Sequence, residues 1–386
     1  MNYELTLPRH IVFGCGRRRE ISSLVQPLGF RAIVVCGSKT LEKNCEMDAI
    51  RDSLKKANID VLHTADISNE PTVNDVDHYT EGYRFFREKD GVFIIAVGGG
   101  AAIDLGKALA GMIPQTETDT IADYLEGVGR GLVLKEKPLP LLAIPTTAGT
   151  GSEATKNAVI AGTTEDNIPY KKSIRDDRLM PRIVLVDPEL MVSCPATITA
   201  QSGMDAITQL FESYVSRKSQ PFTKALCEQG LSLALDSIVD AVEHPDLLWA
   251  RENMAHAAMF SGITLANAGL GMAHGIAPAL GSICGIPHGL ACAMLLPATL
   301  RVNADVCEIP YKRLATLLVG SGSIEKLIEK IESICCRIGI PAKLGEIGVK
   351  AESIPEIARN SQGSSMKGNP KLLTTEDIAG ILNTLV

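Results

Sequence analysis

The feature that most constrains the fold is a repeated pattern in the first half of the chain. A short run of apolar residues is followed by a glycine-containing turn and then by a segment with helical spacing. One example is the apolar run 32–36, which precedes Gly37 and a helical stretch over 41–57. Another is the run 92–97, which precedes Gly98-Gly99-Gly100 and a further helix. Strands that are apolar throughout are typical of parallel sheets covered by helices on both faces, so an α/β domain is predicted.

Other segments extend this pattern along the chain. Residues 59–62, 140–144 and 183–186 are predicted to be strands. Residues 73–88 are predicted to form a helix that starts at the pair Pro71-Thr72, because proline suits the first turn of a helix. These elements complete a Rossmann-like parallel sheet with its covering helices.

The pattern changes after Asp187-Pro188, where helical spacing dominates and glycine and proline separate the helices. The predicted helices are 199–216, 222–242, 250–266, 289–304, 323–338 and 375–385. We therefore predict an α/β domain over residues 1–187 and an all-helical domain over residues 188–386. A length of 386 residues agrees with two domains, because single cores rarely grow beyond about 250–300 residues.

Composition excludes several classes of function. The net charge is −7 and aromatic residues make up 4% of the chain, so neither a basic footprint nor base-stacking platforms for nucleic acid are expected. No apolar stretch reaches the roughly 20 residues of a membrane span, and the start of the chain has no secretory signal. The ten cysteines are then expected to be reduced thiols, and the protein is expected to be cytoplasmic. A small molecule is the expected partner.

Two turns are candidates for binding a dinucleotide. Gly98-Gly99-Gly100 opens a helix directly after a strand, where the backbone can approach a pyrophosphate at the helix amino terminus. The segment 145–153 follows the strand 140–144 and is rich in hydroxyl groups. Each turn taken alone is equally typical of a tight connection or a flexible loop. Together they would line the carboxyl edge of a parallel sheet, where ligands of such sheets bind.

The turn after the first strand bears on the choice of dinucleotide. Sites for NAD often place a carboxylate here to bind the ribose hydroxyls, whereas this turn reads Gly37-Ser38-Lys39 and contains no acid. A 2′-phosphate would meet a hydroxyl and an ammonium group, so NADP is favoured over NAD. The alternative is that Lys39 is a solvated loop residue.

Three segments of the helical half carry possible metal ligands. Asp205 and Gln209 are four residues apart and share a helix face, while His274 and His288 lie in separate apolar segments. Aspartate with two histidines suits a borderline divalent metal ion with positions left open for other ligands. Buried core histidines are the alternative, and spacing alone does not decide between the two.

The order of these motifs resembles that of the iron-containing (group III) alcohol dehydrogenases. The resemblance runs from Leu7-Pro8 through residues 98–107, 145–153 and 203–206 to Asn369-Pro370, and it includes the stretches around His274 and His288. It implies a dehydroquinate synthase-like architecture, in which an α/β domain binds the dinucleotide and a helical domain binds one metal. It also implies hydride transfer between a nicotinamide and a small alcohol or aldehyde, and a homodimer or larger homo-oligomer.

The resemblance assigns roles to individual residues. Asp205, His274 and His288 would hold the metal and act in catalysis through it, with Gln209 as a further candidate ligand. The residues that would contact the dinucleotide are Gly37, Ser38, Lys39, Gly98, Gly99, Gly100, Asp104, Thr146, Thr147, Gly149, Thr150, Ser152 and Lys172.

Two positions depart from the family pattern. Gln209 and Pro278 stand where the family has histidines, one a metal ligand and one near the substrate. Two alternatives stay open, the second of them because of Gln209. One is a lyase similar to dehydroquinate synthase that uses NAD transiently, and the other is a non-catalytic relative that has lost its metal.

Overall fold

The computed structural model describes residues 2–37, 39–67, 69–164 and 169–386, and the chain divides into two compact units. The α/β unit comprises Thr6–Thr147 and Ser152–Cys194. The helical unit comprises the residues up to Leu5, Ala148–Gly151 and Pro195–Val386. The chain thus passes into the helical unit after Cys194, whereas the sequence pattern changes after residue 187. The short segment Ala148–Gly151 packs with the helical unit although it lies within the α/β half of the sequence.

The described part of the α/β unit is built on a six-stranded sheet in the order β1-β8-β5-β4-β2-β3. All of its strand pairs are parallel, which confirms the predicted fold class. The strands are β1 (His10–Phe13), β2 (Arg31–Cys36), β3 (Asp60–Asp66), β4 (Val92–Gly98), β5 (Leu141–Pro145) and β8 (Ile183–Val186). Only β1 was not predicted, and it has four residues of which His10 is exposed.

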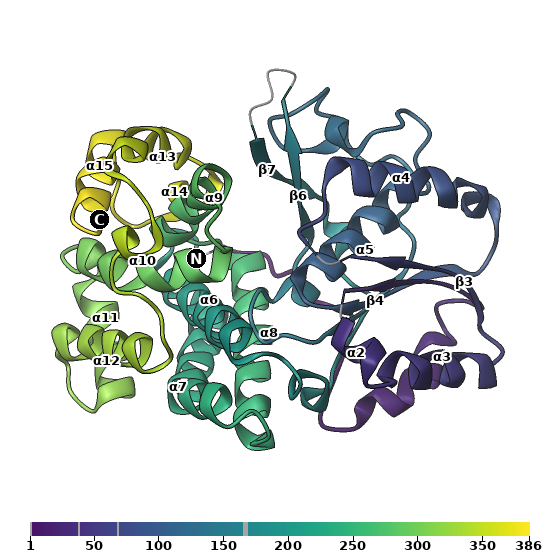
Figure 1. Ribbon diagram of the computed structural model, residues 1–386, viewed down its shortest axis with the longest axis horizontal. Coiled ribbons are helices and arrows are strands. Elements are labelled where there is room, and N and C mark those ends of the chain that lie inside the picture. Colours follow the sequence, from purple (N-terminus) through teal and green to yellow (C-terminus); the bar gives the residue numbers. More distant parts are fainter. Residues whose placement is uncertain (1, 38, 68, 165–168) are drawn as a thin grey trace. The chain divides into compact units, whose positions relative to one another are not determined.

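Helices cover both faces of the sheet because its strands are apolar on both sides. Successive side chains of a strand point to opposite faces, so Ile94 and Ala96 pack with α4 (Val73–Tyr83) and α5 (Gly100–Met112). Phe93 and Ile95 pack on the other face with α1 (Ile21–Val25) and α3 (Glu46–Lys56). Figure 1 shows the strands between these two groups of helices, with the short α2 (Lys39–Lys43) beside α3.

The start of α4 shows how local sequence sets a helix end. The Thr72 side chain accepts a hydrogen bond from the Asp75 backbone N–H, and the Asp75 carboxylate accepts one from the Thr72 N–H, which forms a capping box. Thr72 is therefore the N-cap, and Pro71 lies before the helix rather than in its first turn. The α-helix ends at Tyr83, and a 3₁₀ turn over Arg84–Glu88 completes the predicted segment 73–88.

A second sheet of two antiparallel strands lies outside the parallel sheet. It pairs β6 (Asn157–Thr163) with β7 (Pro169–Arg175), from Asn157 opposite Arg175 to Thr163 opposite Pro169. The sequence did not predict these strands, because polar and apolar residues mix in them without regular alternation.

Helices packed around one apolar core form the rest of the chain. They are α6 (Ala196–Val215), α7 (Pro221–Glu243), α8 (Leu248–Ala268), α9 (Met272–Cys284), α10 (His288–Asn303), α11 (Glu308–Val319), α12 (Ile324–Arg337), α13 (Ile354–Asn360), α14 (Ser364–Gly368) and α15 (Thr375–Asn383). The all-helical prediction is confirmed, although α9, α11, α13 and α14 were not predicted. Among the described residues, no helix has both the length and the apolar character needed to cross a bilayer.

Candidate metal centre and dinucleotide-binding turns

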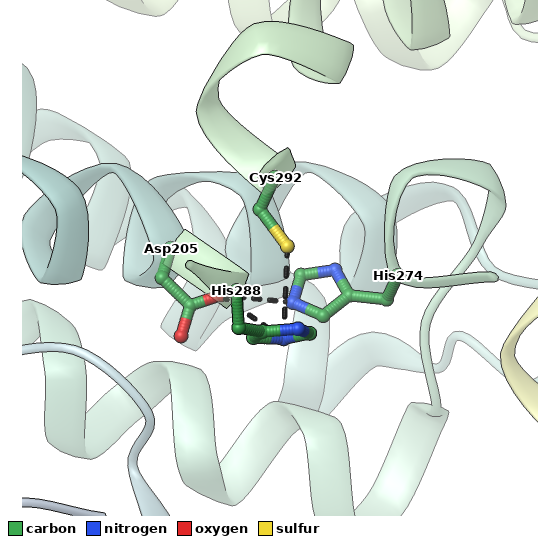
Figure 2. A group of neighbouring side chains, drawn as sticks. All are labelled: Asp205, His274, His288 and Cys292. Carbon is green, nitrogen blue, oxygen red and sulfur yellow. Dashed lines mark hydrogen bonds and ion pairs between the residues drawn. The ribbon is translucent and has the colours of Figure 1, made fainter. Parts of the chain in front are cut away.

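Four potential metal ligands from three helices meet inside the helical unit. Asp205 lies on α6, His274 on α9, and His288 and Cys292 on α10. One donor atom from each side chain lies within 4.8 Å of the donor atoms of the other three, and Figure 2 shows the four converging. The structure thus brings together the three residues predicted from the sequence and adds Cys292, which was not predicted.

The helices explain how these side chains come to face one another. His288 is the first residue of α10, directly after the N-cap Pro287. Cys292 follows four residues later, so that it lies on the same face of the helix. His274 lies in the first turn of α9, and Asp205 lies near the middle of α6.

The separations between donor atoms fit a divalent metal ion. His274 Nε2 is 3.0 Å from Asp205 Oδ1, and His288 Nε2 is 3.8 Å from the same oxygen and 3.7 Å from Cys292 Sγ. Ligand bonds of about 2.0–2.3 Å in a tetrahedral site would separate neighbouring donors by about 3.3–3.8 Å. A metal could therefore be accommodated among these atoms with only small shifts of the side chains.

Burial divides the four side chains. Asp205, His274 and Cys292 are buried, whereas the His288 side chain is 34% exposed. The cluster therefore lies within the protein but is open beside His288.

Glu212 fixes the orientation of His274. Its Oε2 lies 2.7 Å from His274 Nδ1, and its Oε1 accepts a hydrogen bond of 2.6 Å from the backbone N–H of Ala273. When Nδ1 donates its proton to Glu212, the lone pair of Nε2 faces the cluster. Metal-binding histidines commonly have a carboxylate partner of this kind. The sequence analysis missed Glu212, although it lies on α6 two turns after Asp205.

The charges of the cluster favour a cation. Burial opposes ionisation of Asp205, but the hydrogen bond from His274 and the nearby His288 outweigh it and leave the pKa of Asp205 lowered. Burial likewise lowers the pKa of His274, but Cys292, Glu212 and Asp205 more than offset it and raise that pKa well above its ordinary value. The buried carboxylates of Asp205 and Glu212 thus favour a positive charge at this point. A divalent cation would satisfy the same carboxylates.

Gln209 lies one turn after Asp205 on α6 and contacts it. Its Nε2 is 3.2 Å from Asp205 Oδ2 and 3.4 Å from the backbone oxygen of Thr150, so the amide nitrogen faces two acceptors. Reversing the amide would place its oxygen against both of them. The Gln209 Oε1 atom is buried and has no hydrogen-bond partner among the described residues. This oxygen is therefore available to water, to a substrate or to a metal.

The segment near the carboxyl terminus supports the helix that carries His274. Asn369 Oδ1 accepts hydrogen bonds from the backbone N–H of Met272 and from Asn303 Nδ2, and Asn369 Nδ2 donates to Asn303 Oδ1. A side chain at Gly271 would come within 2.9 Å of Asn369 Oδ1 and 3.1 Å of Glu212 Oε1. Glycine at 271 thus lets Asn369 and Glu212 reach the first turn of α9.

In the α/β unit, the two predicted turns lie side by side. The backbone N–H of Thr146 donates to the carbonyl of Gly98, and a Cβ atom at Gly99 would lie 3.3 Å from Thr147 Oγ1. Gly98 has a φ of +153°, and a Cβ atom there would lie 2.7 Å from that of Ala102. Gly100 begins α5, so the amino terminus of this helix opens at the carboxyl edge of the sheet.

Asp104 and Ser152 form part of a buried network rather than an open surface. Ser152 Oγ donates to Asp104 Oδ1, and the Val159 N–H donates to Asp104 Oδ2. Lys107 Nζ donates to Ser152, Thr155 and the carbonyl of Asn157, and burial lowers the pKa of Lys107 to about 8. These contacts join α5 to the segment 152–159. They account for Asp104 and Ser152 without a ligand, and a role in cofactor binding stays a prediction.

The other predicted cofactor residues are more dispersed. Lys172 is exposed on β7 opposite Ile160. Gly149 and Thr150 belong to the helical unit, where a Cβ atom at Gly149 would lie 2.5 Å from that of Ser202. The glycine at 149 is thus explained by packing against α6.

The turn after β2 is described only in part. A Cβ atom at Gly37 would lie 2.6 Å from that of Ala102, which explains the glycine. Ser38 and the side chain of Lys39 lie outside the described residues. Next to this turn, the carboxylates of Glu42 and Asp66 lie within 4.8 Å of each other and of Cys36 Sγ.

Comparisons with known proteins agree along the whole chain. The family described as "Iron-containing alcohol dehydrogenase" matches residues 8–188, and "Fe-containing alcohol dehydrogenase family, C-terminal" matches residues 199–386. The NAD-dependent methanol dehydrogenase of Bacillus methanolicus is 30% identical, over 97% of this chain and 98% of its own. The 1,3-propanediol dehydrogenase of Klebsiella pneumoniae is 32% identical, over 98% of this chain and 97% of its own.

Solved structures show the same architecture. The crystal structure of sulfoacetaldehyde reductase from Bifidobacterium kashiwanohense in complex with NAD⁺ has a TM-score of 0.89 and 30% identity, and the match covers 100% of this chain and 99% of that one. The fold is therefore dehydroquinate synthase-like, as the sequence predicts. The chain belongs to the iron-containing alcohol dehydrogenase family, and it is an oxidoreductase that acts on CH–OH groups.

Proposed function

We propose that this protein transfers hydride between a nicotinamide dinucleotide and a small alcohol or aldehyde, at a metal held by Asp205, His274 and His288. The observation that carries this proposal is the convergence of these three side chains, from α6, α9 and α10, on one point. Nothing in their positions along the sequence required them to meet. A core histidine needs neither a buried carboxylate at 3.0 Å nor a second histidine beside it.

The protein's own groups prepare the site for this reaction. Glu212 holds the His274 ring, Gln209 holds Asp205, and the carboxylates supply the negative charge that binds a cation. A divalent metal bound there supplies Lewis-acid chemistry to the substrate oxygen, and the nicotinamide supplies or accepts the hydride. The exposed side of the cluster, beside His288, is where we place the entry of the substrate. Pro278 lies inside α9 and cannot move a proton, so we assign proton exchange to water, the cofactor ribose or Thr150.

The dinucleotide is proposed to bind at Gly98–Gly100 with Thr146 and Thr147. The amino terminus of α5 favours a pyrophosphate there, and the glycines carry no side chain that would keep the backbone away from it. The other predicted cofactor residues are also proposed to contact the dinucleotide: Gly37, Ser38, Lys39, Asp104, Gly149, Thr150, Ser152 and Lys172.

We propose NADP as the preferred form, because the turn Gly37-Ser38-Lys39 contains no acid. Three observations favour NAD. One relative is named NAD-dependent, and a similar solved structure is described as a complex with NAD⁺. In addition, Glu42 and Asp66 place negative charge near the end of β2, where a 2′-phosphate would need Lys39 as its counter-charge.

We further propose that the enzyme is cytoplasmic and forms a homodimer or a larger homo-oligomer, as the family resemblance implies. No disulfide joins the described cysteines, which agrees with a reducing compartment. Fe²⁺ and Zn²⁺ are the metals proposed from the donor set.

The deciding experiment combines metal content with steady-state turnover. Wild-type protein supplied with Fe²⁺ or Zn²⁺ is assayed with short-chain aldehydes and each reduced dinucleotide. His274→Ala and His288→Ala are expected to lose bound metal and turnover while still binding dinucleotide. His244→Ala, an exposed histidine after α7, is the control and should retain both.

Each alternative predicts a different result. A dehydroquinate synthase-like lyase would consume substrate with no net turnover of the dinucleotide. A non-catalytic relative would bind no metal in any preparation. If both histidine variants unfold and lose dinucleotide binding together, the two residues are parts of the core and the proposed site is wrong.

A further inference from the structure

The sequence offered no role for Cys292, yet the structure places it among the predicted ligands. Its sulfur lies 3.7 Å from His288 Nε2, and it belongs to the group of four donors within 4.8 Å of one another. The side chain is fully buried and comes from the same helix face as His288. In Figure 2, Cys292 lies above the His274 and His288 rings, and Asp205 lies to their left.

We propose that Cys292 is the fourth protein ligand of the metal, and that an Asp205/His274/His288/Cys292 set makes this member of the family prefer Zn²⁺ to Fe²⁺. This inference rests on the metal site of the proposed function and adds a residue and a metal preference to it. With four protein ligands, the substrate oxygen would bind as a fifth ligand, a coordination number that catalytic zinc can reach.

The first argument is geometric. A ligand bond to sulfur of about 2.3 Å and one to imidazole of about 2.0–2.1 Å, at a tetrahedral angle, would separate sulfur and nitrogen by about 3.6 Å. The observed separation of 3.7 Å matches this value. His288 and Cys292 are one helical turn apart on α10, so the backbone holds them at this spacing.

The second argument concerns Gln209, which stands where the family has a histidine ligand. Its amide nitrogen donates hydrogen bonds to Asp205 Oδ2 and to the Thr150 carbonyl. The Gln209 side chain is therefore engaged with Asp205, which is itself a proposed metal ligand. A carboxamide oxygen is also a weaker donor than an imidazole nitrogen or a thiolate. The chain therefore lacks a strong donor at 209 and has one at 292. Gln209 is then a positioning residue, which holds Asp205 and leaves its own Oε1 for water or substrate.

The third argument is the chemistry of sulfur. Thiolate ligands favour Zn²⁺ and other soft or borderline ions, and Asp/His/His/Cys is a set of types that zinc commonly binds. The thiol must lose its proton to bind, so that Cys292–SH and M²⁺ give Cys292–S⁻–M²⁺ and one proton released to solvent.

X-ray absorption spectroscopy at the metal edge tests the ligand directly in the zinc-loaded wild-type protein. We expect one sulfur neighbour at about 2.3 Å, beside nitrogen and oxygen neighbours at about 2.0–2.2 Å. Cys292→Ala and Cys292→Ser should both lose the sulfur neighbour. Cys227→Ala removes another fully buried cysteine of the same helical unit and should keep it. Because the wild-type spectrum decides the question alone, poor folding of a variant does not leave the inference untested.

Competition between metals tests the preference. Apo-protein is incubated without oxygen in equal concentrations of Fe²⁺ and Zn²⁺, and the bound metals are measured by elemental analysis. Because an Asp/His/His site alone already prefers zinc, the measure is the change in the zinc-to-iron ratio, which should be at least tenfold higher in wild type and Cys227→Ala than in Cys292→Ala.

The outcomes separate this inference from the proposed function. Metal-dependent turnover with only nitrogen and oxygen neighbours in the wild-type spectrum would refute Cys292 as a ligand and leave the dehydrogenase intact. Sulfur coordination with equal uptake of iron and zinc would refute the preference. A wild-type protein that binds no metal would overturn both proposals together.

Discussion

Glu212 is the residue whose substitution best tests how the metal site is built. It is buried beside His274 and accepts two hydrogen bonds, one from His274 Nδ1 and one from the Ala273 backbone. Glu212→Gln keeps the size and one acceptor oxygen, but it removes the negative charge. One of the two donors, His274 Nδ1 or the Ala273 N–H, must then face an amide nitrogen that cannot accept, and in either orientation the ring loses its charged partner.

The size of the effect follows from comparable sites. Loss of such a carboxylate–histidine partner typically lowers metal affinity by about 10- to 100-fold, which is about 1.4 to 2.8 kcal/mol. Glu212→Ala is more severe, since it leaves two buried N–H donors without an acceptor. Each such donor costs about 1–3 kcal/mol, so we expect the free energy of unfolding to fall by about 2–6 kcal/mol.

Two measurements separate affinity from folding. Metal affinity is obtained by competition with a chromophoric chelator, and the free energy of unfolding of the apo-protein by denaturant titration. Glu228→Gln is the matched control, since Glu228 also lies in the helical unit but pairs with Tyr214 and Arg313. It should leave metal affinity unchanged. If Glu212→Gln binds metal as tightly as wild type, the orientation of His274 does not depend on this carboxylate, and the reasoning fails.

Three further predictions concern other parts of the chain. Gln209→His should tighten metal binding and shift selectivity toward iron, while Gln209→Ala should cost little metal affinity. Elemental analysis across a chelator titration measures both effects. If Gln209→Ala loses its metal as completely as Asp205→Ala, Gln209 is a full ligand. Ser38→Asp should shift preference from NADPH toward NADH, measured as the ratio of kcat/KM values, and equal use of both by wild type and variant would contradict the cofactor assignment. Burial raises the pKa of Glu153 from 4.5 to about 7, so the stability that its protonated form provides is present below pH 4.5 and is lost as the pH rises to about 7. Glu153→Gln should therefore gain stability relative to wild type across that range in denaturant titrations. If the difference in the free energy of unfolding between variant and wild type does not change with pH, Glu153 ionises normally.

The sequence predicted the parallel sheet well because its signal is local. The apolar run 92–97 became β4 (Val92–Gly98), since a strand buried on both faces must be apolar throughout. The β6–β7 pair carries no such signal, because Lys171 and Lys172 interrupt its apolar residues. Helix α9 was missed for another reason. It contains Gly275, Pro278 and Gly281, which disfavour a helix locally, and it is stabilised by packing within the helical core.

The candidate site was predictable only in part. Spacing alone left Asp205, His274 and His288 open to interpretation as core residues, and it was the resemblance to a family that singled them out. In the sequence, Cys292 is one more small residue of an apolar helix, and only its position one turn after His288 could have marked it as a candidate ligand. Glu212 could have been found two turns after Asp205 on the same helix face.

The contacts of Asn369 have a consequence for how the protein is made. Asn369 accepts hydrogen bonds from the backbone N–H of Met272 and from Asn303, yet it lies 97 residues after Met272 along the chain. During synthesis, the segments that carry Asp205, His274 and His288 leave the ribosome well before it. Chains are made from the amino terminus and domains fold as units, so the first turn of α9 gains this support only after Asn369 has been made. We therefore expect metal loading to follow the synthesis of this segment, and a chain truncated before Asn369 to bind metal more weakly although it keeps every proposed ligand.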